Sequence, residues 1–232
     1  MFEDPLFWLL VGPGLALGLY AQARIKANVT KYSQVPTRDG ITGAEVARRL
    51  LDAKGLQDVK VETTEGVLSD HYDPRAKVLR LSQEVYYTPS VAAAGIAAHE
   101  TGHALQDARD YFPMELRTYI VPVVQLASQA APWAFVGGLM LQWDVLTWIG
   151  VILFGASFVF ALLTLPVEFN ASARAKELLM SHGIIGKKEL EGVDKVLDAA
   201  AWTYVAAAVS AIGVWLFYVF MLIGRGRSAS AR

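Results

Sequence analysis

His99, Glu100 and His103 form a His-Glu-X-X-His pattern at residues 99–103. Histidines four positions apart share one face of a helix, so two imidazole nitrogens can converge on one metal ion. Zinc suits such a site, because it accepts two imidazoles and one carboxylate and keeps a fourth position for water, whose pKa falls towards ~7. The pattern therefore predicts zinc-assisted hydrolysis, with Glu100 as the general base that takes a proton from that water.

The context of the pattern argues against a chance occurrence. Two of the four histidines of the chain fall in it, and the preceding residues 91–98 are small and apolar, as in a helix packed in a core. Thr88 followed by Pro89 is typical of a helix start, which predicts a helix from Thr88 to about Asp107. A buried, capped helix is a suitable support for two metal ligands.

The third ligand must come from elsewhere, and the chain contains no cysteine. The metzincin pattern would need glycine and histidine where Gln106 and Arg109 stand, which excludes that class. Glu168 is the strongest candidate, because it directly follows an apolar segment, where an unpaired carboxylate is costly. The alternative is an ordinary acid at a helix N-terminus. The remaining downstream candidates are Glu177, His182, Glu189 and Glu191.

Three further side chains are candidate partners of the site. His71 or Tyr72 can orient a ligand or stabilise the transition state, although turn formation at the Asp73-Pro74 step explains this polar run equally well. Ser172 lies one helical turn after Glu168 and can hydrogen-bond a ligand.

The elements that must position these residues are mostly apolar helices. Hydrophobic residues make up 54% of the 232 positions and charged residues 19%, and the mean hydropathy is +0.34. This composition indicates a membrane protein.

Four segments approach the ~20 residues that cross a bilayer: residues 6–23, 119–141, 145–167 and 204–223. The segment at residues 6–23 lacks a basic leader and a cleavage site and is expected to be a retained anchor. Polar residues and prolines in the segment at residues 119–141 predict a kink or a partly interfacial position.

The polar segments between the spans are expected to carry the chemistry. Residues 24–118 predict a small α+β unit that contains the histidine pair, and residues 168–201 predict a helical segment that contains the third ligand. Residues 224–232 are a polar tail that need not fold. The predicted fold class is a mostly α membrane protein with about four transmembrane helices and a small α+β zincin-like metallopeptidase unit, all in one domain, 1–232.

Local signals define several elements of the polar segments. Thr42 and Glu45 predict a capping box for a helix from Gly43 to Ala53. Residues 59–62 and 77–81 alternate as strands do. In the second segment we expect one helix to Met180, a break at Gly183 and Gly186, and a second helix.

Lysine and arginine placement predicts the orientation in the membrane. Basic residues follow the first span and lie between the third and fourth, which favours a cytoplasmic position for both polar segments. Three arginines within residues 225–232 conflict with the resulting external C-terminus. The expected location is the bacterial inner (plasma) membrane, multi-pass, with the site facing the cytoplasm near the membrane.

Other functional classes fit less well. A net charge of -1 and a pI near 6.4 provide no basic surface for nucleic acid. A transporter or channel would place charged residues inside the spans, and these spans lack them. The main alternative to a peptidase is a catalytically silent zinc-binding membrane adaptor, although a purely structural site would not need Glu100. Expected partners are the lipid bilayer and a protein or peptide substrate; homo-oligomers and larger membrane complexes stay open.

Four stretches together resemble the YugP-like family of bacterial neutral zinc metallopeptidases: residues 68–74, 79–82, 97–106 and 165–172. The resemblance implies a membrane-embedded zinc peptidase with His99 and His103 as ligands, Glu100 as base and Glu168 as third ligand. A more distant similarity is to HtpX-like and CAAX-processing membrane peptidases, which usually carry an aspartate four residues after the ligand glutamate. This chain has Ser172 there.

Overall fold

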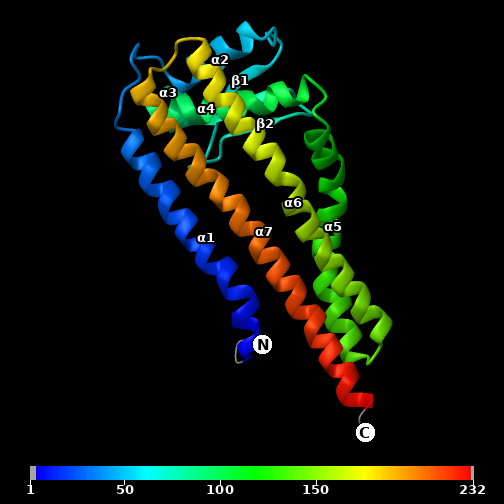
Figure 1. Ribbon diagram of the computed structural model, residues 1–232. Helices are drawn as coiled ribbons and strands as arrows, with labels where there is room; N and C mark the ends of the chain where they lie inside the picture. The colour runs from blue at the N-terminus through cyan, green and yellow to red at the C-terminus, as the bar shows by residue number, and fades with distance from the viewer. Residues whose placement is uncertain (1–3, 231–232) are drawn as a thin grey trace. The chain divides into compact units, whose positions relative to one another are not determined.

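The computed structural model describes the backbone of residues 4–230 and the side chains as far as Gly224. Within that range, helices dominate and a single small sheet is present (Figure 1). The helices are α1 (Pro5–Tyr32), α2 (Gly43–Ala53), α3 (Gln83–Tyr87), α4 (Val91–Asp107), α5 (Phe112–Met140), α6 (Asp144–Ser181) and α7 (Lys187–Ser230). The strands are β1 (Lys60–Thr64), β2 (His71–Asp73) and β3 (Val78–Ser82).

The chain divides into two compact units. The apolar unit consists of Met1–Tyr20, Leu116–Leu165 and Trp202–Arg232. The polar unit consists of Ala21–Glu115 and Pro166–Ala201. The two predicted polar segments, which are far apart in sequence, therefore form one body.

Four helices contribute to the apolar unit and are long and apolar enough to cross a membrane: α1, α5, α6 and α7. This confirms the predicted number of segments that are long and apolar enough to span. Inside the unit, Phe7 and Val11 of α1 pack against Phe217 of α7, with the two phenylalanine rings edge to face at 5.3 Å. The helices are longer than the predicted spans, because α1 continues to Tyr32 and α6 to Ser181 without a break.

The polar unit contains a mixed three-stranded sheet. β3 lies in the centre, pairs parallel with β1 and pairs antiparallel with β2. Four of its five residues are buried, as expected for a central strand covered on both faces. Both predicted strands are present, each shifted by one or two residues.

α4 is the core helix of the polar unit. Its first two turns are almost entirely buried alanine, valine and glycine, and α2 packs against it. A helix that is apolar on all sides must be covered on all sides, which explains its small residues. The core also takes Leu79 and Leu81 of β3, and Val193 of α7, all fully buried.

The start of α4 differs from the prediction. Ser90, not Thr88, is the N-cap, and its hydroxyl accepts a hydrogen bond of 3.1 Å from the Ala93 backbone N–H. Thr88 instead ends α3, a short helix that the sequence analysis did not predict. Pro89 is held outside the helix, since its carbonyl accepts a hydrogen bond from the Thr37 backbone.

Other local predictions are confirmed. The capping box of Thr42 and Glu45 is complete, and α2 has the predicted bounds. The break between the two helices of residues 168–201 falls between Ser181 and Lys187, with Gly183 at φ +66°. The tail differs from expectation, because α7 continues to Ser230; no proline interrupts it.

Candidate metal centre

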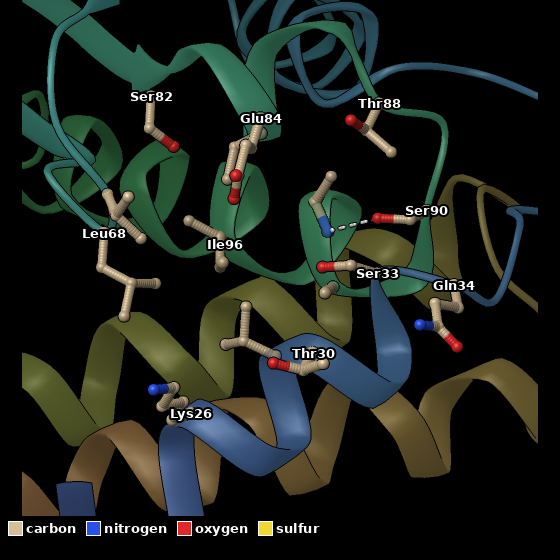
Figure 2. Close-up of a pocket in the computed structure, with 15 residues that line it drawn as sticks. Lys26, Thr30, Ser33, Gln34, Leu68, Ser82, Glu84, Thr88, Ser90 and Ile96 are labelled. Atoms are coloured by element: carbon tan, nitrogen blue, oxygen red, sulfur yellow. Dashed lines mark hydrogen bonds between the residues drawn. The ribbon is translucent and has the colours of Figure 1, made fainter.

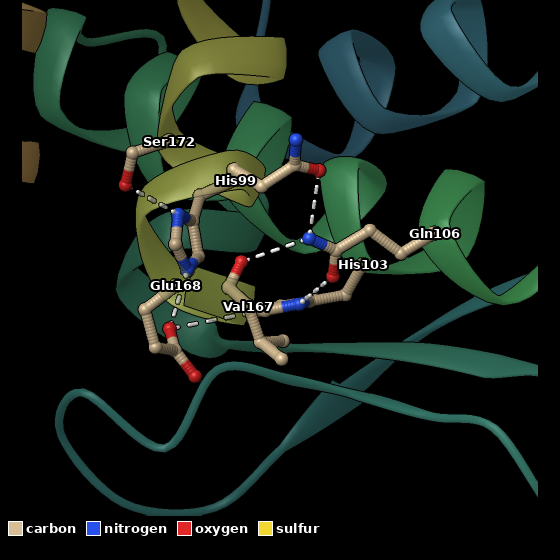
Figure 3. Close-up of polar contacts among 7 residues, drawn as sticks. His99, His103, Gln106, Val167, Glu168 and Ser172 are labelled. Carbon is tan, nitrogen blue, oxygen red and sulfur yellow. Dashed lines mark hydrogen bonds and ion pairs between the residues drawn. The ribbon is translucent and has the colours of Figure 1, made fainter. Parts of the chain in front are cut away.

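The metal centre is built by two helices of the polar unit. α4 carries His99 and His103 on one face, and α6 presents Glu168 to them (Figure 3). The close packing of these helices depends on Gly102. A Cβ atom at that position would lie 2.8 Å from the Ala171 carbonyl oxygen, closer than real side chains approach. The glycine between the histidines therefore allows α6 to reach the metal-binding face of α4.

The three predicted ligands have the geometry of a zinc site. Glu168 Oε2 lies 3.2 Å from His99 Nε2 and 3.5 Å from His103 Nε2. Donor atoms bound to one tetrahedral zinc at ~2.0–2.1 Å are separated by about 3.3 Å. The two short contacts therefore match two edges of a coordination tetrahedron. Among the described residues, this is the group of three or more ligand-type side chains that could hold a metal ion, and all its donor atoms lie within 4.8 Å of one another.

The other ring nitrogens have partners that suit the tautomers needed for metal ligation. His99 Nδ1 lies 3.1 Å from the Ser172 hydroxyl, and His103 Nδ1 lies 2.9 Å from Gln106 Oε1. If both Nδ1 atoms carry the hydrogen and donate it, both Nε2 lone pairs face Glu168, the arrangement that metal ligation needs. Ser172, for which the sequence analysis proposed a hydrogen bond to an unspecified ligand, lies beside His99.

Gln106 is a functional residue that the sequence analysis did not find. Its side chain is fully buried, and its amide nitrogen donates hydrogen bonds to the Val167 carbonyl at 2.8 Å and to Asn170 Oδ1 at 3.0 Å. These two acceptors determine which end of the amide is nitrogen, so the oxygen faces His103. Gln106 thereby joins one ligand, His103, to the backbone immediately before another, Glu168.

Replacing Gln106 by leucine is expected to weaken zinc binding by about 10-fold to 100-fold, the usual cost of losing a partner that orients a metal ligand. Leucine has a similar size, but it cannot accept the His103 hydrogen or donate to Val167. The measurement is competition for zinc with a chromophoric chelator. Gln57→Leu, at an exposed glutamine of the same unit, is the control and should bind zinc as the wild type does. Equal affinities for both variants would contradict the orienting role.

Glu100 lies beside the ligands on α4 and is 8% exposed. Within the described part of the chain, its carboxylate accepts no hydrogen bond and forms no ion pair, unlike the Glu168 carboxylate. Its negative charge nevertheless acts on His103, as described next. A buried carboxylate with unoccupied acceptor positions is free to take a proton from a water molecule.

The electrostatics of the centre favour a cation. Burial lowers the pKa of His103, but its contact with Glu168 and the negative charges of Glu100 and Glu168 raise the pKa more, so it lies above its usual value. The surroundings of the imidazole thus stabilise positive charge at this point. A zinc ion supplies that charge and leaves both imidazoles neutral, as ligands must be.

The other candidates from the sequence lie apart from this group. The Tyr72 hydroxyl donates a hydrogen bond of 2.6 Å to Asp107, and burial followed by that hydrogen bond raises the tyrosine pKa, so the proton is retained. His71 is exposed, and its Nδ1 lies 2.8 Å from the Ser69 carbonyl oxygen. Of the alternative ligands, Glu189 binds the backbone N–H groups of Arg38 and Gly186, which occupies both its oxygens.

Comparison with known proteins agrees with this geometry. The family described as "Putative neutral zinc metallopeptidase" matches residues 7–223. The chain is 51% identical over 221 residues to a Bacillus subtilis (strain 168) protein named "Putative membrane protease YugP", and the match covers 95% of this chain and 98% of that protein. No solved structure gives a significant match. The chain therefore belongs to the family of neutral zinc metallopeptidases, with zinc as the metal for its His/His/Glu group.

Proposed function

We propose that this protein is a zinc-dependent endopeptidase that hydrolyses peptide bonds of membrane or membrane-proximal proteins. The observation that carries the proposal is the grouping of His99, His103 and Glu168, with both glutamate–histidine distances those of a tetrahedral zinc site, beside the unbonded carboxylate of Glu100. This combination of three ligands and one base resembles that of gluzincins. A purely structural zinc site would instead be closed by a fourth protein ligand and would have no use for the base.

Each residue has a distinct task in the proposed reaction. When bound, zinc polarises the substrate carbonyl and lowers the pKa of water towards ~7. Glu100 takes a proton from the attacking water as the new C–O bond forms at the carbonyl carbon. It then gives this proton to the amide nitrogen as the C–N bond breaks, so one carboxylate serves as base and then as acid. Gln106 and Ser172 keep the two imidazoles oriented throughout.

The position of Glu168 in the chain supports a membrane-linked substrate. Glu168 lies in α6, three positions after Leu165. Leu165 is the last residue of the second section of the apolar unit, Leu116–Leu165. The related Bacillus protein is named a membrane protease. Substrates that are themselves embedded in the bilayer would be concentrated near such a site, so we propose that they are cut in preference to freely soluble chains.

We propose that the polar unit faces the cytoplasm of a bacterial plasma membrane. Its two sequence segments are separated by α5 and the apolar part of α6, which return the chain to the same side if both cross. The basic residues that flank the spans within this unit, among them Arg24, Lys187 and Lys188, favour the cytoplasmic side.

Labelling of single cysteines can test the orientation, because the natural chain has no thiol. Trp143→Cys, between α5 and α6, is expected to react with a membrane-impermeant maleimide in intact spheroplasts. Lys187→Cys, at the start of α7, is expected to react only after the membrane is opened. The reverse pattern would show that the zinc site faces outwards.

The proposed activity is tested on purified wild-type protein in detergent. We expect about one zinc per chain by elemental analysis, as a single His/His/Glu site implies, and cleavage of casein or of a membrane-derived peptide. A chelator should stop the cleavage, and added zinc should restore it. Stoichiometric zinc without cleavage of either substrate would favour the catalytically silent adaptor, and absence of zinc would contradict the proposal altogether.

A further inference from the structure

A cavity of about 500 Å³ lies in the polar unit between the end of α1, the loop before β2, and α3 and α4 (Figure 2). This volume is within the range of small-molecule and side-chain binding sites in proteins, ~300–1,000 Å³. Its buried wall includes Val85 of α3 and Ala92, Ala93 and the half-buried Ile96 of α4, together with two buried serines, Ser82 and Ser90. Much of this wall is therefore apolar.

The cavity adjoins the catalytic face of α4. Ala93, Ile96 and Glu100 follow one another at intervals of three and four positions, so their side chains share one face of the helix. Ile96 lies one helical turn before Glu100, which corresponds to a rise of about 6 Å. An extended peptide advances ~3.3 Å per residue. A substrate held at the metal would therefore bring a side chain within two residues of its scissile bond to this cavity.

The loop over the cavity has unusual features of its own. Val67 and Leu68 line the cavity, yet they are 76% and 45% exposed, so apolar surface is left open to solvent at its rim. Leu68 also has φ +54°, a left-handed conformation that bulky residues rarely adopt. A leucine that is both strained and exposed to solvent lowers the stability of the fold, so stability does not explain its presence. Residues with strained backbones are concentrated at binding and active sites.

The same loop is anchored to the end of β3 by Asp70. Asp70 accepts hydrogen bonds from the backbone and the hydroxyl of Ser82, a buried residue of the cavity wall, at 2.8 and 3.1 Å. Burial raises the pKa of Asp70, and the negative charge of Glu100 raises it further. The hydrogen bonds from Ser82 lower this pKa but do not cancel the rise. The loop that carries Leu68 is thus fixed within electrostatic range of the proposed general base.

We propose that this cavity is the subsite that binds a large apolar side chain of the peptide substrate, within two residues of the scissile bond, with Ile96 and Leu68 as the residues that determine specificity. The inference rests on the proposed peptidase function and adds the class of residue that directs cleavage. Figure 2 shows Leu68 and Ile96 on one side of the cavity and Lys26 and Thr30 of α1 on the other.

The lining favours a peptide over a lipid acyl chain as the occupant. Hydroxyls of Thr30, Ser33 and Thr88 are exposed or half-buried around the apolar wall. A peptide brings amide groups that can hydrogen-bond to these hydroxyls beside its apolar side chain, whereas a hydrocarbon tail would desolvate them without compensation. Lys26 and Glu84 add one charge of each sign at the exposed rim and give no net preference for a charged side chain.

The first test measures binding without turnover. Fluorescently labelled hexapeptides that differ at one position, leucine against aspartate, are titrated by anisotropy into the zinc-loaded Glu100→Gln protein. We expect the leucine peptide to bind about 10-fold to 100-fold more tightly, the effect of burying one such side chain. Ile96→Trp in the same background should remove most of the difference, because the larger indole ring takes up space at the apolar wall where the leucine side chain would lie.

A second pair of variants separates specificity from folding. Leu68→Asn places a residue that tolerates positive φ at the strained position, so the unfolding temperature should be unchanged or higher. The preference for leucine should nevertheless fall several-fold. The matched control is Tyr87→Asn, which removes a large side chain outside the cavity that is 65% exposed, against 45% for Leu68. It should keep the full preference.

The same peptides incubated with the wild type separate failure of this inference from failure of the proposed function. If the wild type cuts none of them although the binding preference is present, the peptidase proposal fails and the cavity stands only as a binding site for an apolar side chain of a peptide. If the leucine and aspartate peptides bind equally, or if Ile96→Trp and Leu68→Asn leave the preference intact, the subsite is wrong whether or not cleavage occurs. Equal loss of preference in Tyr87→Asn would also overturn it.

Discussion

Glu100→Gln is expected to abolish measurable peptide hydrolysis while the protein keeps its zinc. Glutamine has almost the same shape as glutamate, but it cannot take a proton from water or return one to the leaving amine. Removal of a general base typically lowers the rate by about 10²-fold to 10⁴-fold, and here the same group is proposed to act twice. Cleavage of casein by matched amounts of zinc-loaded wild type and variant gives the rate ratio.

The separation of activity from metal content is the decisive feature of that experiment. Glu177→Gln, an exposed acid on α6, is the matched control and should retain the wild-type rate. If Glu100→Gln hydrolysed peptides as fast as the wild type, another group would have to be the base. If Glu100→Gln lost both zinc and activity, Glu100 would be needed for the metal site, and the loss of activity would not identify it as the base. Zinc content is therefore measured on the same sample.

Glu168→Ala is expected to lower zinc affinity by about 10²-fold to 10³-fold. The binding free energy of a structural zinc site is ~10–16 kcal/mol, so one of four coordination positions accounts for about 2.5–4 kcal/mol. The carboxylate is only 2% exposed and contacts both histidines, so no nearby solvent-exposed acid can replace it easily. Zinc competition against a chelator measures the loss, and peptide hydrolysis should fall in parallel.

Glu177→Ala serves as the control for Glu168→Ala, because Glu177 was an alternative ligand from sequence and lies nine positions further along α6. It should bind one zinc with wild-type affinity. Stoichiometric zinc of unchanged affinity in Glu168→Ala would exclude Glu168 as a ligand. A loss of zinc in Glu177→Ala, with Glu168→Ala unaffected, would transfer the assignment to Glu177.

Much of the metal site could be predicted because its signals are local. The two histidines converge through helix geometry alone, which depends only on their spacing. Glu168 was identified because a carboxylate directly after an apolar segment is costly without a partner, and the structure places it against both imidazoles. The capping box of Thr42 and Glu45 is likewise complete within four residues.

The predictions that failed depended on contacts between distant segments. Both Thr88 and Ser90 can cap a helix. The choice is made by residues 35–37, whose backbone bonds to Pro89 and Val91 and holds Ser90, which lies between them, extended. The sequence indicated the role of Gln106 only weakly, as a polar residue three positions after the metal ligand His103. Its role depends on the Val167 carbonyl, 61 residues further along the chain. The cavity around Ile96 has no local signal, because four separate segments line it.

The order of residues along the chain also determines when the enzyme becomes complete. His99, Glu100 and His103 leave the ribosome first, whereas Glu168 follows only after all of α5 and the apolar part of α6. Before that point the nascent chain has two imidazoles without their carboxylate, and the anchor that Gln106 needs has not been made. The proposed catalytic centre can therefore assemble only once the third candidate span, α6, has been synthesised. On the proposed function, a chain in the middle of its own insertion would not yet be able to cut its neighbours.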